Sequence, residues 1–262
     1  MVTPPREPTR RLVFIGASNL TRAFPRILRL VSRFWEEPLD VVTALGHGRS
    51  FGMTSRVIAR ILPGILASRM WQTLRAANPL PTHSVITDIG NDILYHAPVE
   101  QVAQWVESCL QRLKELDSTI VMTRLPVDHL PQLGKTRFLF FRSLLVPTCR
   151  LSFDEVIDRA VALDRRVCEL AEQYEATIVP HQALWYGLDP MHIRRRQMTI
   201  AWREILGSWV AQHATLTSEE RLRMSWLRFQ SLAPDERILC GMHQRHEQPT
   251  WRFEDGSRLS IY

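Results

Sequence analysis

The chain has 262 residues, a formal net charge of +6 and a hydrophobic fraction of 45%. Its length suits one large domain with a substantial core, and its ordinary balance of apolar and charged residues excludes a wholly disordered, fibrous or collagenous protein. The positive charge comes almost entirely from arginines dispersed along the chain, and the densest cluster, 194–196, is typical of a solvated helix face. We therefore expect no nucleic-acid partner.

The four cysteines are widely spaced and form no Cys-x-x-Cys pair, so we expect free thiols and no metal site. The first ten residues are rich in proline and arginine and have no apolar core of a signal peptide. Nowhere do about 18 uncharged apolar residues run together. These features predict a cytoplasmic protein that does not insert into a membrane.

Five short apolar runs each end near a glycine, a proline or a polar loop, which is typical of strands buried on both faces of a parallel sheet. They cover residues 12–15, 41–45, 84–87, 119–122 and 176–179. Helical spacing fills the intervals at 20–35, 53–74, 99–116 and 152–174. This alternation predicts a three-layer α/β/α sandwich around a mostly parallel sheet of about five strands, with ligands bound beyond the carboxyl ends of the strands.

The C-terminal part has a different character. Helices are expected at 195–212 and 217–230, and apolar residues alternate on both sides of Asp255-Gly256, a pattern typical of a β-hairpin. We expect a flexible segment at 1–10, one main domain at 11–214, and an appendage of a helix and a hairpin at 215–262.

The first loop that could carry chemistry follows the first strand. Gly16 permits a sharp turn, and Ser18 then precedes a helix whose N-terminal amides favour a developing negative charge. A serine in this position is more often a simple N-cap, so Ser18 alone does not indicate a nucleophile.

Two further loops carry glycine and a carboxamide. The second strand is followed by a glycine-rich loop, 46–52, that lacks the Gly-Lys-Ser/Thr ending of a phosphate-binding loop but could donate backbone N–H groups. The third strand leads to Asn91, which lies between Gly90 and Asp92 and could stabilise an oxyanion without carrying charge.

The fourth loop, after the fifth strand, contains Asp189 and His192. Their spacing of three residues allows the carboxylate to bond one ring nitrogen while the other faces a nucleophile. Trp185 and Tyr186 lie just before this pair and could either form a wall of the site or pack in the core.

Taken in chain order, these loops resemble the blocks of the SGNH, or GDSL, serine hydrolases, which have a flavodoxin-like α/β fold. The resemblance covers about residues 11 to 210. It implies an esterase in which Ser18 is the nucleophile, His192 the base and Asp189 its orienting partner. The Ser18 amide, the Asn91 side chain and the amide of a glycine on the second loop would form the oxyanion hole. Gly48 is preferred to Gly46 for this role because of its spacing from the strand. The resemblance further implies a small-molecule ester substrate and no cofactor or metal. His47, Trp185 and Tyr186 are additional candidates for substrate binding.

One residue departs from the family pattern: Ala17 stands where the first block usually has Asp, which puts the local geometry in doubt. Two other functions stay open, namely acyl transfer to a sugar or other alcohol by the same residues, and a non-catalytic binding protein of the same fold. The apolar segment 138–146 could be a lid or acyl pocket, although a buried core helix is the more common interpretation. His243 and His246, near Cys240, lack a fourth metal ligand.

Overall fold

The computed structural model describes residues 6–128, 134–189, 191–211 and 220–262. All five predicted strands are present, side by side and parallel, in the order β2-β1-β5-β6-β7. Their bounds are β1 (Arg10–Ile15), β2 (Leu39–Ala44), β5 (Thr82–Ile86), β6 (Thr119–Thr123) and β7 (Thr177–Val179). The order reverses between β1 and β5, which is where doubly wound sheets open a ligand crevice.

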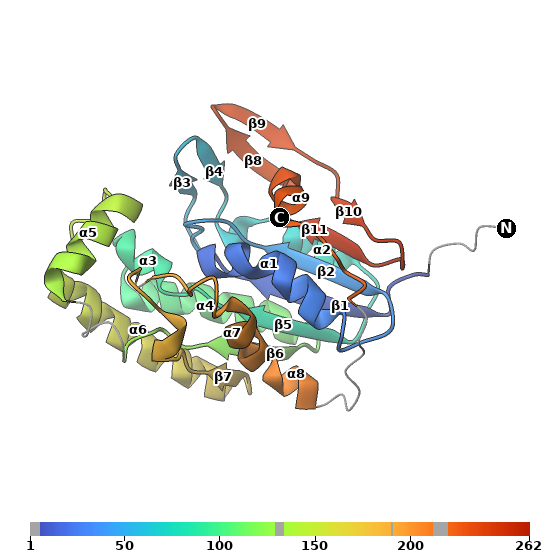
Figure 1. Ribbon diagram of the computed structural model, residues 1–262, viewed down its shortest axis with the longest axis horizontal. Coiled ribbons are helices and arrows are strands. Elements are labelled where there is room, and N and C mark those ends of the chain that lie inside the picture. Colours follow the sequence, from blue (N-terminus) through green and yellow to red (C-terminus); the bar gives the residue numbers. More distant parts are fainter. Residues whose placement is uncertain (1–5, 129–133, 190, 212–219) are drawn as a thin grey trace.

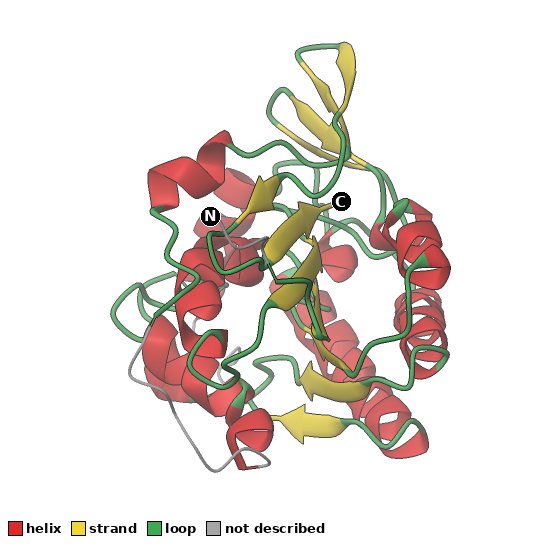
Figure 2. Ribbon diagram, turned by 90° about the vertical axis from the view of Figure 1, so that its right-hand side faces the viewer, coloured by secondary structure: helices red, strands yellow, loops and turns green. Residues whose placement is uncertain are grey.

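Helices cover both faces of this sheet, so the predicted three-layer α/β/α sandwich is confirmed (Figures 1 and 2). One core layer lies against α4 and α6, and the other against α1, α7 and α8. The long helix α6 begins with a capping box between Ser152 and Glu155, as its sequence favours. The bounds are α1 (Ser18–Val31), α4 (Val99–Lys114), α6 (Phe153–Gln173), α7 (Met198–Ile205) and α8 (Gly207–Ala211).

The central sheet has seven strands, two more than expected. The predicted hairpin at Asp255-Gly256 is confirmed as β10 (Trp251–Arg252) and β11 (Arg258–Ile261). β11 pairs in parallel with β2 and extends the sheet at that edge, with Leu259 and Ile261 buried. The sequence pattern identifies the hairpin but not the sheet edge to which it adds.

A long helix at 53–74 was the wrong expectation. The segment forms β3 (Ser55–Val57), β4 (Arg60–Leu62), the short 3₁₀ turn η1 (Ile65–Ala67) and α2 (Met70–Ala76). Pro63 and Gly64 interrupt any helix there, because proline lacks a donor and glycine is flexible. The hairpin joins β8 (Glu236–Leu239) and β9 (Met242–Arg245) in a second, four-stranded sheet.

The helices near the C-terminus are shorter than expected. The helix predicted at 195–212 is divided into α7 and α8, and residue 212 lies outside the described residues. The one predicted at 217–230 is reduced to α9 (Trp226–Ser231), with 217–219 also outside them. No described helix is both long and apolar enough to span a bilayer.

The apolar segment near residue 140 forms α5 (Lys135–Leu145). A buried core helix is the wrong interpretation for at least two of its residues, since Leu139 is 41% and Phe140 is 63% exposed. Both are on a helix that packs on α6, at one end of the molecule (Figure 1). The interpretation of this segment as a lid or part of an acyl pocket therefore stays a prediction.

Candidate active site

The four predicted loops all follow carboxyl ends of parallel strands. Ser18 is the first residue of α1, directly after β1, and Asn91 is the first residue of the short helix α3 (Asn91–Leu94), after β5. Because β2, β1 and β5 are neighbours, the glycine-rich loop, Ser18 and Asn91 come out of adjacent strands. Ser18 is 8% exposed.

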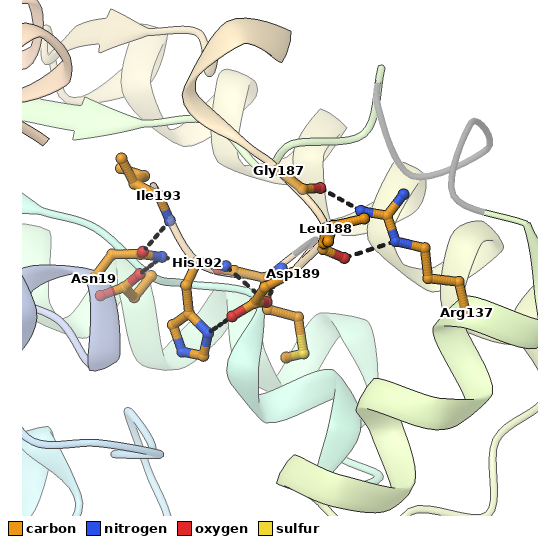
Figure 3. A network of polar contacts seen from close by, with 9 residues as sticks. Asn19, Arg137, Gly187, Leu188, Asp189, His192 and Ile193 are labelled. Carbon is orange, nitrogen blue, oxygen red and sulfur yellow. Dashed lines mark hydrogen bonds and ion pairs between the residues drawn. The ribbon is translucent and has the colours of Figure 1, made fainter. Parts of the chain in front are cut away.

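Asn19 holds the histidine loop against the serine loop (Figure 3). Its Nδ2 donates to the Met191 carbonyl at 3.1 Å, and its Oδ1 accepts from the Ile193 amide at 2.8 Å. These two contacts bracket His192 on both sides. The residue next to Ser18 therefore fixes the backbone that carries the histidine, although the two lie more than 170 positions apart in the sequence.

Asp189 orients His192. The Nδ1 atom of His192 lies 2.7 Å from Asp189 Oδ2, while Oδ1 of the same carboxylate accepts from the Met191 and His192 amides at 2.9 and 3.3 Å. Burial raises the pKa of Asp189, but the hydrogen bond and charge of His192 outweigh it and lower that pKa below its ordinary value. An ionised Asp189 leaves Nε2 as the ring nitrogen available for proton transfer.

Asp88, on the loop after β5, caps the N-terminus of α1, the helix that begins at Ser18. Its Oδ2 accepts from the amides of Ala17 and Leu20 at 2.9 and 3.1 Å, and its Oδ1 accepts from Asn19 Nδ2 at 2.8 Å. The helix has no capping side chain of its own. Asp88 adopts a positive φ of 59°, a conformation that Asp tolerates better than most residues. The N-terminus of α1 is thus capped by a carboxylate from the loop after β5.

Three donors are available for an oxyanion. Within the described residues, neither the Ser18 nor the Gly48 amide has a hydrogen-bond acceptor, and the buried Nδ2 of Asn91 has none either. The buried Nδ2 of Asn91 without a partner costs free energy, and a ligand that supplies an acceptor there would remove this cost.

The glycine-rich loop is held in a shape that requires glycine at position 48. Gly48 has a φ of +63°, and a Cβ there would lie 2.7 Å from the Tyr95 hydroxyl, which donates to the Gly48 carbonyl at 2.6 Å. Asp92 braces the same loop by accepting from the Phe51 amide at 2.9 Å. Burial raises the pKa of Asp92 to about 6, against the opposing effect of that hydrogen bond.

The other three candidate residues occupy different environments. Burial lowers the pKa of His47 to about 4, and the positive charges of Arg60 and His192 lower it in the same direction. The His47 ring is therefore neutral at pH 7. Tyr186 lines a cavity beside the site, and its hydroxyl contacts the ring of His181. Trp185 packs in the core.

The cavity that Tyr186 lines has a volume of about 110 Å³ and mostly apolar walls. Asn91 and Asp88 lie in its wall, so the cavity adjoins one of the residues expected to bind the oxyanion. Most of the apolar lining comes from the loops after β5 and β6, from α3 and from α6, namely Ile89, Ile93, Leu94, Leu125, Pro126, Val156 and Ala160. Asn19, His181 and Met191 also line the cavity. Such a pocket suits an apolar acyl group.

Searches by sequence find no matching protein-family model and no matching curated protein. Solved structures do match. The native aryl esterase of M. smegmatis is 14% identical with a TM-score of 0.51, covering 76% of this chain and 99% of its own, and its inhibitor-bound form is 13% identical with a TM-score of 0.51, covering 79% and 100%. A member of the lipolytic G-D-S-L family from Veillonella parvula is 10% identical with a TM-score of 0.47, covering 76% and 97%.

The chain has the SGNH-hydrolase fold. The matched structures are covered almost completely, whereas about a fifth of this chain lies beyond them. The shared fold accounts for the three layers, and the site contacts described above are those of this chain.

Two residues at this site were not predicted to have a role. The sequence shows Asn19 beside Ser18, but its bonds reach residues on the last loop, which no local pattern reveals. The sequence assigns no role to Asp88, because its bonds to the N-terminus of α1 depend on the adjacency of β1 and β5. The only indication in the sequence was that Asn19, a polar residue, stands next to the candidate nucleophile Ser18.

Proposed function

We propose that this chain is a serine hydrolase that cleaves carboxylic esters through an acyl-enzyme intermediate. The observation that carries the proposal is the clamp of Asn19 on the backbone either side of His192, which ties the candidate base to the residue next to the candidate nucleophile. Such fixed positioning is what nucleophilic catalysis by serine requires.

In the proposed reaction, Nε2 of His192 removes the proton from the Ser18 hydroxyl while the Ser18 oxygen attacks the ester carbonyl carbon. Ionised Asp189 stabilises the resulting imidazolium and holds its Nδ1 proton. The charge on the carbonyl oxygen is taken up by the Ser18 and Gly48 amides and by Asn91. The imidazolium then protonates the departing alcohol, and a water molecule activated by His192 releases the acid from Ser18.

We assign the acyl group to the apolar cavity, because Asn91 lies in its wall and would contact the carbonyl oxygen at its mouth. The volume of about 110 Å³ is somewhat smaller than an engineered cavity of roughly 150 Å³ that binds benzene. Short acyl chains are therefore the expected substrates.

The direct test replaces Ser18 with Ala and measures hydrolysis of 4-nitrophenyl acetate and butyrate, together with labelling by a fluorophosphonate probe. We expect Ser18→Ala to lose both turnover and labelling, while its far-UV circular dichroism spectrum stays that of the wild type. Ser108→Ala, on the exposed face of α4, is the matched control. Full activity or full labelling of Ser18→Ala would refute the assignment. Product analysis with added alcohols distinguishes hydrolysis from acyl transfer.

A further inference from the structure

A second hollow of about 390 Å³ lies beside the candidate active site and is rich in arginine. It is bounded by α1, by the segment leading into α7 and by the first residue of α9. Four arginines line it with one proline, one methionine and one tryptophan: Arg22, Arg26, Arg29, Arg195, Pro25, Met198 and Trp226. We call this hollow the arginine groove.

One wall of the arginine groove starts from the nucleophile. Arg22, Arg26 and Arg29 follow Ser18 at intervals of four, four and three residues, which places them on one side of α1. At a rise of 1.5 Å per residue, the guanidinium-bearing positions lie roughly 6, 12 and 16 Å from Ser18 along the helix axis. The groove therefore leads away from the reacting serine.

The opposite wall starts from the histidine. Arg195 is the third residue after His192, and Met198 is the first residue of α7, which packs on α1. The charge of Arg22 acts on both Asp189 and His47, so the groove and the catalytic groups lie within one electrostatic field. Each wall thus connects directly to one of the two reacting side chains.

The four positive charges are not neutralised within the described residues. None of the four makes an ion pair there, and the one side-chain hydrogen bond of Arg26 among these residues is to the sulfur of Met198 at 3.8 Å. Burial, then the charges of Arg195 and Arg29, lower the pKa of Arg26. Arg22 and Arg26 are half-buried and Arg29 and Arg195 are exposed, whereas the buried Arg11 is paired with Asp40. Unpaired like charges gathered in a hollow are stabilised by an anionic ligand.

We propose that the arginine groove binds phosphate groups on the alcohol part of the ester substrate, an inference that rests on the proposed esterase function. Guanidinium groups bind phosphate in a bidentate manner, and four of them suit a doubly charged phosphate or a diphosphate better than a single carboxylate. Trp226 is 47% exposed at the groove and offers a flat surface for a ring attached to the phosphate.

Binding can be tested apart from catalysis. Inorganic pyrophosphate is titrated calorimetrically into the Ser18→Ala protein, with and without Arg26→Ala. Loss of one charge-assisted contact is expected to weaken binding about tenfold or more. Arg203→Ala, an exposed arginine of α7 outside the groove, should bind as the parent does. Equal affinities of the Arg26 and Arg203 variants would overturn the proposal.

Specificity is tested with a matched substrate pair, 6-acetoxyhexyl phosphate and hexyl acetate, by measuring acetate release. We expect the ratio of the two kcat/KM values to favour the phosphorylated ester and to fall about tenfold in Arg26→Ala but not in Arg203→Ala. Binding of a single-stranded oligonucleotide or of phosphatidylglycerol vesicles, without measurable affinity for pyrophosphate, would instead indicate a macromolecular surface and refute the small-ligand proposal. Hydrolysis of neither ester by the wild type would refute the esterase, while the pyrophosphate titration still decides the groove.

Discussion

Replacing Asp88 by Asn tests whether the Asp88 carboxylate, on the loop after β5, positions the proposed nucleophile Ser18. Asp88 accepts three hydrogen bonds, two from backbone amides of the serine loop and one from Asn19. The asparagine introduced at position 88 would keep one acceptor oxygen. If that oxygen takes the two amides, the new NH₂ group faces the NH₂ group of Asn19, and two donors oppose each other.

The expected loss of stability and of activity follows from these contacts. One hydrogen bond to a charged group is lost and two are weakened, so we expect the free energy of unfolding to fall by about 2–3 kcal/mol. Rotation of the Asn19 amide would relieve the clash but would break its bonds to Met191 and Ile193, which hold the histidine loop. A misplacement of roughly 1 Å costs about 100-fold in rate, so kcat should fall by that order while KM changes little.

The assay measures kcat and KM for 4-nitrophenyl acetate, with urea unfolding on the same proteins. Asp158→Asn, an exposed aspartate on α6, is the control. Wild-type kcat and stability in Asp88→Asn would refute the positioning role, and a change in KM alone would show that Asp88 acts on substrate binding.

Three other perturbations have defined outcomes. Asn91→Ala should lower kcat about 10²- to 10³-fold without unfolding the protein, as measured by steady-state kinetics beside Gln104→Ala; an unchanged kcat would remove Asn91 from the oxyanion hole. Folding raises the pKa of Asp92 from 3.8 to about 6, so the folded state binds the extra proton and stability falls as pH rises through that window, by about 3 kcal/mol. Asp92→Asn keeps an acceptor for Phe51 and should lack this fall in urea unfolding from pH 4 to 7; an identical slope would contradict it. Deleting 251–262 removes four buried apolar side chains and a strand paired with β2, so it should cost about 5 kcal/mol or more in thermal or urea unfolding, whereas an independent appendage could be removed without loss.

The fold was predictable where local pattern and burial coincide. The strands β1, β2, β5 and β6 are buried along almost their whole length, and α4 and α6 have a regular apolar stripe, so each was identified nearly to its ends. The region 53–74 was not, because its apolar residues pack from a hairpin, a turn and a short helix, and spacing alone does not distinguish these from one helix. The attachment of β11 to β2 depends on pairing between residues more than 200 positions apart.

The site was predictable by residue type and order but not by its supports. Ser18, Asn91 and the Asp189/His192 pair stand at strand ends, which sequence can indicate. The hydrogen bonds that hold the loops of Ser18 and His192 together come from Asn19 and Asp88, whose partners are 68 to 174 positions away in the sequence. The arginines of α1 were counted as dispersed surface charge, since their convergence with Arg195 exists only when α1 and α7 pack together.

The C-terminal strand and the oxyanion loop are coupled through one buried side chain. Arg49 follows Gly48, is fully buried, and donates to the carbonyls of Leu45 at 3.1 Å and Pro63 at 3.2 Å, and also to that of Tyr262. Burial lowers the pKa of Arg49 to about 9, so the guanidinium remains charged at pH 7 and depends on these acceptors. Loss of the strand would leave part of this charge unsatisfied directly beside the Gly48 amide. The hairpin therefore contributes to the geometry of the site as well as to the edge of the sheet.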